Sequence, residues 1–278
     1  MVEQEAVGSS AAASSPIVTS AVSQEVPEMI PSASGRSSRP VTLNEHTSDS
    51  STPDENSSEK MPGYERLWRL VLAVAIVGGP LGYDVGSILI PAVHEDGATS
   101  IAANAAANPI TNTVHLVAYV LASFLLPLGA AGLAYLAYAR APWLATIGGL
   151  LAVVGWLPFS ALTALDDLTM AMAALPDSGS YATLLDRFAN DAVMGGYLLV
   201  YIVGHLVAYV LLAVALRRAG VIPGWAAWSM AASSPLTVAV FVLPGRPLVL
   251  GDVALTLLVI GCIPAARTMA TRNRLSNP

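Results

Sequence analysis

Ring side chains recur at every fourth position of an apolar stretch. They are Tyr197, Tyr201, His205 and Tyr209. On an α-helix this spacing forms one slanting ridge that drifts by about 40° per step. Because each ring nitrogen of a histidine inside a membrane needs a hydrogen-bonding partner, we predict that the ridge faces the interior of a helix bundle. The ridge could bind a polar or aromatic ligand or relay protons, or it could be a hydrogen-bonded seam between helices worth about 1 kcal/mol per contact.

A carboxylate stands in a second apolar stretch, directly after a weak point of the helix. Asp84 follows Gly78-Gly79-Pro80-Leu81-Gly82-Tyr83. Proline removes a backbone hydrogen bond and glycine weakens a helix, so free carbonyl oxygens and a carboxylate would lie together. This combination predicts a cation or proton site. In the alternative interpretation, Gly78 and Gly82 form a close helix contact and Asp84 reaches the outer headgroups.

Further ionisable residues are expected near the same membrane face as Asp84. Ionisable groups within membrane spans are costly and usually face a bundle interior or a water-filled cavity. We therefore predict an outward-facing polar cavity for a small polar ligand or a cation. The candidate ligand-binding residues are Asp84, His115, Asp166, Asp167, Tyr197, Tyr201, His205 and Asp252. Ordinary contacts with headgroups and water are the alternative for each acidic residue taken alone.

Signatures of enzymes and of metal sites are absent or incomplete. The segment His94-Glu95-Asp96-Gly97-Ala98 begins like a zinc-protease helix but lacks the second histidine. The sequence contains no Gly-x-Ser-x-Gly elbow and no Walker loop. Cys262 is the single cysteine, which excludes an intrachain disulfide and a cysteine-based zinc site. We expect no catalytic residue, no metal and no cofactor.

The elements that must position these residues follow from the composition. The chain of 278 residues is 54% hydrophobic and only 12% charged, with a mean hydropathy of +0.61, whereas roughly a quarter of the residues of soluble proteins are charged. A helix needs about 20 apolar residues to cross ~30 Å of hydrocarbon. The sequence predicts an all-α, polytopic transmembrane bundle with six spans, namely Leu67–Ile90, Thr113–Tyr138, Trp143–Thr163, Ala192–Leu216, Ile222–Leu243 and Leu248–Ala266.

Basic residues indicate how these spans are oriented. One side of the predicted spans carries Lys60, Arg66, Arg69, Arg140, Arg217, Arg218, Arg267, Arg272 and Arg274, whereas the other carries only Arg187 and Arg246. Since Lys and Arg near helix ends are retained in the cytoplasm, we predict that both termini are cytoplasmic. Trp68, Trp143, Trp225 and Trp228 mark the same face, because indole prefers the headgroup layer. We expect the protein in the bacterial cytoplasmic membrane.

Two of the predicted external loops are too long to be simple turns. Helical spacing over Ala161–Leu175 and over Tyr181–Asp191 predicts two short interfacial helices. Together they would form a small cap on the external side.

The first sixty residues differ from the rest of the chain. Residues 1–60 hold fifteen Ser, five Pro, nine acidic and three basic residues, and no Phe, Trp or Tyr. This composition offers too little apolar surface to offset the entropy of ordering, so we predict a disordered tail before a transmembrane domain at 61–278. The acidic start is unlike a secretory signal. Three interpretations remain open: a solvated tail with no specific role, a tail regulated by phosphorylation, and a start-site error with Met61 as the true start.

A heptapeptide occurs twice, ninety positions apart. The segments His115-Leu-Val-Ala-Tyr119-Val-Leu121 and His205-Leu-Val-Ala-Tyr209-Val-Leu211 are identical. The depth of each histidine is predicted from its distance in sequence to the next arginine, Arg140 or Arg217. This distance places His115 near the outer interface and His205 near the midplane. A duplicated helix pair and coincidence in an Ala/Leu/Val-rich chain are both open.

Several short motifs are shared with a known group of proteins. They include Gly78-Gly79-Pro80-Leu81-Gly82, Ala139-Arg140-Ala141-Pro142 and Arg217-Arg218-Ala219-Gly220-Val221-Ile222-Pro223-Gly224-Trp225-Ala226. With these motifs, residues 61–274 resemble the uncharacterised bacterial six-helix integral membrane proteins. The resemblance implies a six-helix fold and no assigned activity.

Together these patterns favour two functions of different classes. The first is a transporter or small-ligand binder with an outward-facing polar cavity. The second is a non-catalytic membrane scaffold or accessory subunit, and a membrane enzyme acting on lipid-linked substrates is less favoured. The expected partners are the lipid bilayer, a small polar ligand or cation, and a membrane partner protein. No nucleic acid is expected.

Overall fold

The computed structural model describes residues 63–91, 96–243 and 248–271. Within these ranges the chain forms helices and no strand, which confirms the all-α prediction. The predicted tail lies outside the described residues, as do His94, Glu95 and Arg246. All described residues belong to one structural unit, Ser58–Pro278.

The helices of the described part are long and mostly apolar. They are α1 (Gly63–Leu89), α2 (Gly97–Ala106), α3 (Pro109–Tyr138), α4 (Pro142–Ala173), the 3-10 turn η1 (Ser178–Tyr181), α5 (Ala182–Ala189), α6 (Ala192–Arg218), α7 (Gly224–Val242) and α8 (Leu248–Thr271). Five of them, α1, α3, α4, α6 and α8, are long and apolar enough to cross a membrane. The protein therefore has the character of a multi-pass membrane protein. Helix α7 has 19 residues and is not among these five.

Local capping signals determine where several helices begin. At the start of α3, the Asn108 side chain accepts hydrogen bonds from the backbone N–H groups of Ile110 and Thr111, and Pro109 occupies the first turn. Proline is tolerated there because its missing N–H would have no partner within the helix. Asp191 caps α6 in the same way by accepting from the N–H of Val193. The helix starts thus follow from Asn, Asp and Pro residues in the sequence.

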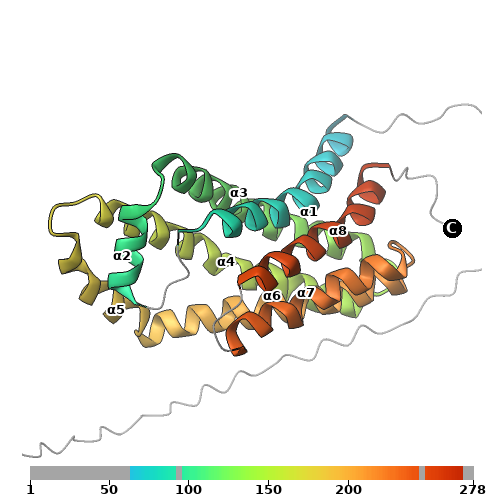
Figure 1. The fold of residues 1–278 in the computed structure, drawn as a ribbon. Coiled ribbons are helices and arrows are strands. Elements are labelled where there is room, and N and C mark those ends of the chain that lie inside the picture. The colour runs from blue at the N-terminus through green and yellow to red at the C-terminus, as the bar shows by residue number, and fades with distance from the viewer. Residues whose placement is uncertain (1–62, 92–95, 244–247, 272–278) are drawn as a thin grey trace, which may run out of the picture. The chain divides into compact units, whose positions relative to one another are not determined.

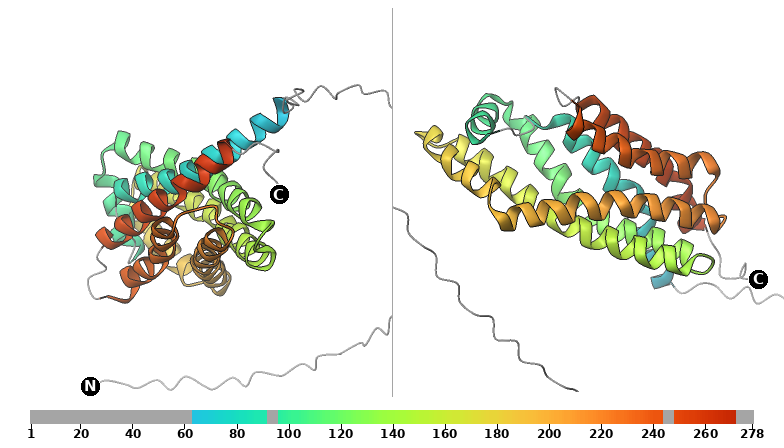
Figure 2. Two further views of the ribbon diagram at one scale, coloured as in Figure 1. Left: turned by 90° about the vertical axis from the view of Figure 1, so that its right-hand side faces the viewer. Right: turned by 90° about the horizontal axis from the view of Figure 1, so that it is seen from below.

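The six long helices form a closed ring in which each helix packs against the next one in the chain. The contacting pairs are α1 with α3, α3 with α4, α4 with α6, α6 with α7, α7 with α8, and α8 with α1. Helix α1 begins, and helix α8 ends, at the same end of the bundle, as Figures 1 and 2 show. We call this the arginine end. Helices α2 and α5 lie at the opposite end, which we call the cap end.

Glycine residues allow the closest helix crossings. A Cβ atom added at Gly204 in α6 would lie 2.7 Å from the Cα atom of Gly155 in α4. A Cβ atom added at Gly129 in α3 would lie 2.6 Å from the carbonyl oxygen of Ala75 in α1. Real Cβ atoms do not make such short contacts, so both crossings require glycine. His205 directly follows Gly204 in α6, so its side chain extends from the helix at the crossing with α4.

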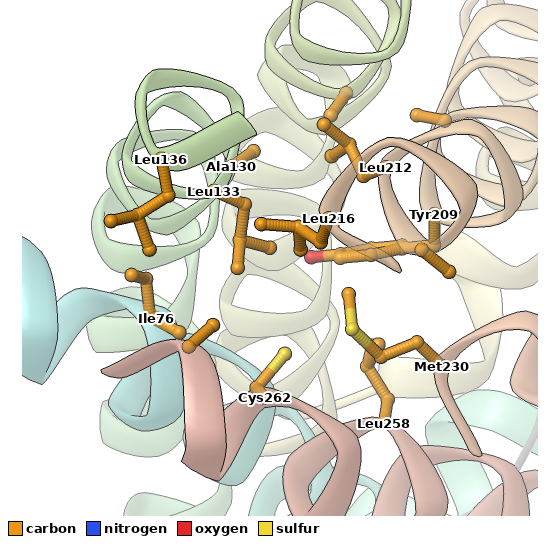
Figure 3. Close-up of a cluster of buried hydrophobic side chains, with 14 of the residues drawn as sticks. Ile76, Ala130, Leu133, Leu136, Tyr209, Leu212, Leu216, Met230, Leu258 and Cys262 are labelled. Atoms are coloured by element: carbon orange, nitrogen blue, oxygen red, sulfur yellow. The ribbon is translucent and has the colours of Figure 1, made fainter. Parts of the chain in front are cut away.

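The half of the bundle nearer the arginine end is filled by apolar side chains. Figure 3 shows side chains of α1, α3, α6, α7 and α8 pointing toward one another in this region. Its members include Ile76, Ala130, Leu133, Leu136, Leu212, Leu216, Met230, Leu258 and Cys262. This packing closes the bundle interior on the side of the arginine end.

Large apolar side chains also lie on the outside of the bundle. Phe124 is 66% exposed, and Leu150 and Leu199 are each 63% exposed. Soluble monomers rarely expose extended apolar surface of this kind. The outer surface therefore fits the hydrocarbon of a membrane.

The cap end differs in part from the prediction. The second predicted helix, Tyr181–Asp191, is present as α5 (Ala182–Ala189), while its place at a membrane interface stays a prediction. The first, Ala161–Leu175, is wrong as a separate element, because α4 runs without a break to Ala173. Its last turns are held by a small apolar cluster of Ile101, Met172 and Leu185 with α2 and α5. Helix α2 was not foreseen.

Hydrogen bonds from acidic side chains hold the cap together. The carboxylate of Asp96 accepts from the backbone N–H of Thr99 at 2.7 Å and from its hydroxyl at 2.9 Å, which caps α2. These bonds favour the charged form and hold the pKa of Asp96 below its ordinary value. The carboxylate of Asp186 accepts from the N–H of Gly97 at 2.6 Å and thereby ties α5 to the start of α2.

Candidate ligand cavity

A continuous group of ring side chains occupies the middle of the bundle. It joins four helices, with Tyr83 from α1, His115 and Tyr119 from α3, Trp156 and Phe159 from α4, and Tyr201, His205 and Tyr209 from α6. Most neighbouring rings meet tilted or edge to face, as between Tyr83 and Phe159, whose centroids are 4.9 Å apart. This is the geometry that aromatic quadrupoles favour. We call this group the aromatic cluster.

A hydrogen bond between two phenols joins α1 to α6 within the cluster. The hydroxyl groups of Tyr83 and Tyr201 lie 2.6 Å apart, and either can be the donor. The two residues are 118 positions apart in the chain. This bond holds the hydroxyl group of Tyr201 in place. The next polar group of the ridge is His205, one turn further along α6.

The imidazole of His205 has its two nitrogens in different surroundings. Its Nδ1 atom is hydrogen-bonded to the backbone carbonyl oxygen of Tyr201. A carbonyl oxygen can only accept, so Nδ1 carries the proton and Nε2 is an acceptor in the neutral ring. The ring stacks on the indole of Trp156, with centroids 4.5 Å apart and planes inclined by 29°. No hydrogen bond from the described residues reaches Nε2.

A cavity of about 210 Å³ lies beside His205. It is enclosed by the aromatic cluster on one side and by α7 and α8 on the other, and it extends toward the cap end, where α1 ends and α8 begins. Its polar lining residues are Tyr83, Ser87, Tyr119, Trp156, His205, Tyr209, Ser233, Ser234 and Thr237. The other lining residues in the described part of the chain are Gly251 and apolar side chains, and none of these described lining residues is Asp, Glu, Lys or Arg.

The hydroxyl groups on α7 give the cavity a row of acceptors. Ser233 and Thr237 donate to carbonyl oxygens of their own helix, at 2.7 and 2.9 Å. Ser234 donates instead to the carbonyl oxygen of Leu206 at 2.8 Å, and this bond ties α7 to α6. Because each hydroxyl proton is already used, the free lone pairs of the three oxygens can accept from a guest.

Trp156 is the largest fully buried side chain of the bundle. It is 1% exposed, and its indole nitrogen has no hydrogen-bond acceptor within bonding geometry among the described residues. The hydroxyl of Tyr209 lies near this nitrogen but outside hydrogen-bonding geometry. The main role of Trp156 is therefore to provide the ring on which the imidazole of His205 stacks.

Two carboxylates lie next to the cavity, at the contact between α1 and α8. Asp252 accepts from the hydroxyl of Ser87 at 3.3 Å. One oxygen of Asp84 accepts from the hydroxyl of Thr256 at 3.1 Å, while the other is buried without a hydrogen-bond partner in the described part of the chain. Neither carboxylate lines the cavity itself.

The structure brings some of the predicted site residues together and separates others. His205 lines the cavity, while Tyr201 and Asp252 each hydrogen-bond a residue that lines it. His115 is 1% exposed, its Nδ1 lies 2.7 Å from the carbonyl oxygen of Gly86, and its ring contacts that of Tyr119. These residues form the cavity wall and the layer behind it.

The remaining predicted residues do not line the cavity. Asp166 is half-buried and Asp167 is exposed, both toward the cap end of α4, and neither lines the cavity. The prediction of an inward ridge is correct for Tyr201, His205 and Tyr209 but wrong for Tyr197, which is 48% exposed. Three steps of about 40° turn the ridge by about 120° between Tyr209 and Tyr197. The predicted polar residues thus do not meet in one vestibule.

Sequence reasoning missed several residues of the cavity wall. Trp156 had a usable signal, because a tryptophan in the centre of an apolar stretch is too deep for the headgroup layer. The serine pair Ser233-Ser234 with Thr237 had a weaker signal, since such hydroxyls usually bond their own helix. Tyr83 had no signal in the sequence, because its hydrogen bond with Tyr201 depends on which helices pack against each other.

The described residues contain no group of three or more His, Cys, Asp or Glu side chains that could hold a metal ion.

Comparisons with protein-family models, with curated proteins and with solved structures gave no match to this chain. The resemblance to six-helix membrane proteins stays a prediction.

Proposed function

We propose that this protein is a membrane-embedded binder or transporter of a small, uncharged ring compound that carries a hydrogen-bond donor. The proposal is supported by the cavity beside His205, which has a wall of aromatic rings; among the described residues its lining is uncharged and no group donates to Nε2. A hydroxyl or N–H of the guest would donate to Nε2 or to a hydroxyl oxygen of α7. The ring of the guest would contact Tyr83, Tyr119 and Trp156.

The size of the cavity supports a guest with a single ring. A dry apolar cavity of ~150 Å³ holds benzene, and this cavity measures about 210 Å³. The volume leaves room for one ring with a small polar substituent. A charged guest is disfavoured, because none of the lining side chains that the structure describes carries a charge and desolvation of an ion is costly.

The proposed topology has six crossings, with α7 as the sixth. In support of it, α7 packs between α6 and α8, both of which are long and apolar enough to cross. An even number of crossings also agrees with the fact that α1 begins and α8 ends at the same end of the bundle. Because Arg140, Arg217 and Arg218 lie at that end, we place it in the cytoplasm of a bacterial cell and the mouth of the cavity on the outer side.

A scaffold or accessory subunit is the second candidate function. It is favoured by the fact that most polar groups in the bundle already have partners, such as the Tyr83–Tyr201 pair and the bond from Ser234 to Leu206. In that case the polar groups would only hold the helices together. The free Nε2 of His205 and the open volume beside it favour the binder.

A thermal-shift screen tests the proposal. Detergent-purified protein is heated with phenol, indole and related uncharged ring compounds, and with their charged analogues benzoate and indole-3-acetate. We expect stabilisation by an uncharged donor compound, and loss of that shift in His205→Ala but not in Tyr197→Phe, a change on the outer surface. Equal shifts in both variants, or a preference for the charged analogues, would contradict the proposed site.

A second experiment tests the proposed topology. Reporter fusions after Arg140 and after Asp177 should show opposite sidedness, with the first in the cytoplasm. A fusion in the segment 244–247, after α7, should match the one after Asp177. If it matches the fusion after Arg140 instead, α7 does not cross.

A further inference from the structure

A groove between α6 and α7 lies at the arginine end of the bundle. The groove has a volume of about 300 Å³ and lies on the outer surface of the bundle, away from the aromatic cluster. Along the helices it is lined by the small or apolar side chains of Ala213, Val214, Ala227 and Ala231. Alanines on both helices leave an open slot where larger side chains would fill the space.

The mouth of the groove is strongly positive. Arg217 and Arg218 end α6, both are exposed, and both line the groove. No carboxylate among the described residues forms an ion pair with either guanidinium group. Arg140 lies at the same turn, since its Nη1 donates to the carbonyl oxygen of Ala219 at 3.1 Å. Three cations therefore gather here, and no carboxylate within 63–91, 96–243 or 248–271 forms an ion pair with Arg217 or Arg218.

The start of α7 adds a second feature that favours an anion. No side chain caps this 19-residue helix at Pro223, so the backbone N–H groups of its first turn have no side-chain partner. The helix dipole also places partial positive charge at this point. A Cβ atom added at Gly224 would lie 3.7 Å from Nε of Arg217, so this helix start and the guanidinium group are neighbours.

The groove and the charges together specify the occupant. We propose that an anionic phospholipid binds here, with its phosphate between Arg217, Arg218 and the first turn of α7, and with one acyl chain in the alanine-lined groove. Trp228, which is 77% exposed and lines the same groove, would lie beside the headgroup. A free phosphate ion would use the charges but not the groove. Basic pockets between membrane helices are suited to anionic headgroups.

The proposal is tested by lipid titration of the delipidated, detergent-purified full chain, with bound lipid counted by native mass spectrometry. The probes are dioleoyl-phosphatidylglycerol, dioleoyl-phosphatidylcholine and inorganic phosphate. Each arginine near an anionic surface contributes roughly a fivefold change in affinity. The double variant Arg217→Gln/Arg218→Gln should therefore bind phosphatidylglycerol about 25-fold more weakly than the wild type. Arg187→Gln, at the cap end, is the matched control and should bind as the wild type does.

A second variant separates the lipid from a free anion and does not depend on the arginines. Ala231→Leu fills the groove and leaves the charges in place, so it should weaken phosphatidylglycerol binding and leave phosphate binding unchanged. Equal affinity of the wild type and the double variant for phosphatidylglycerol would overturn the proposal. So would equal affinity for phosphatidylcholine, or competition by inorganic phosphate at the same concentration as the lipid. None of these outcomes bears on the cavity beside His205.

Discussion

The crossing of α4 with α6 gives the sharpest quantitative prediction, because it positions His205. A Cβ atom added at Gly204 would lie 2.7 Å from Cα of Gly155, whereas carbon atoms in contact are about 3.5–4.0 Å apart. The two helices would have to separate by roughly 1 Å. Overpacking of this kind costs about 1–3 kcal/mol, and the better helix propensity of alanine returns up to about 1 kcal/mol.

These two terms allow a loss of about 0–3 kcal/mol in the free energy of unfolding, and we expect Gly204→Ala to fall in the middle of this range, at about 1–2 kcal/mol. For a domain of this size, 1 kcal/mol corresponds to about 2–4 °C in the melting temperature, so the variant should melt roughly 2–8 °C below the wild type. The assay is thermal unfolding in detergent at one fixed scan rate, since membrane proteins often unfold irreversibly.

The same helix provides a matched control. A Cβ atom added at Gly195 meets nothing within 4 Å, so Gly195→Ala gains helix propensity without a clash. It should melt at the wild-type temperature or a few degrees above it. Equal melting temperatures for Gly204→Ala and Gly195→Ala would refute the close crossing.

Three further predictions concern other parts of the bundle. Trp156→Ala should cost about 3–5 kcal/mol, because the side chain is fully buried, whereas Trp143→Ala, at a position 80% exposed, should change the melting temperature by little; similar losses would contradict the central place of Trp156. Asp84→Asn should leave the melting temperature unchanged or raise it by about 2–4 °C, since one carboxylate oxygen is buried without a partner in the described residues; a clear decrease would mean that the charge is stabilised. The lowered pKa of Asp96 in the folded protein means that its cap stabilises α2 at neutral pH and is lost as the pH falls below the ordinary value of 3.8. Hydrogen exchange protection of α2 should then drop in acid, and Asp96→Asn, which keeps an acceptor but cannot titrate, should remove this pH dependence.

Much of the fold could be predicted from the sequence, because the bilayer sets the length of each apolar stretch. The predicted span Ala192–Leu216 differs from α6 (Ala192–Arg218) by two residues at one end. The prediction failed where the stabilising contacts lie in the cap of short helices. Helix α4 continues to Ala173 because its last turns pack on α2 and α5, and no apolar run marks that contact in the sequence.

The candidate site was predictable only in part. Spacing along one helix placed Tyr201, His205 and Tyr209 on the inner face, since that relation depends on helix geometry alone. It could not supply Tyr83 or Trp156, because their contacts with Tyr201 and His205 depend on which helices are neighbours in the ring. Asp84 was expected in the cavity, but its side chain turns toward Thr256 of α8, and the sequence does not show that pairing.

The cavity beside His205 is the proposed binding site of the guest. Gly251 lines this cavity, and a Cβ atom added there would lie 3.6 Å from Val240, an ordinary contact. Gly251→Leu should therefore fill the cavity without breaking the bundle, while Gly195→Leu places the same side chain on the open surface. The direct measurement is the affinity of both variants and the wild type for the best ring compound from the thermal-shift screen. We predict at least a tenfold loss of affinity in Gly251→Leu alone; undiminished binding in that variant would contradict the account.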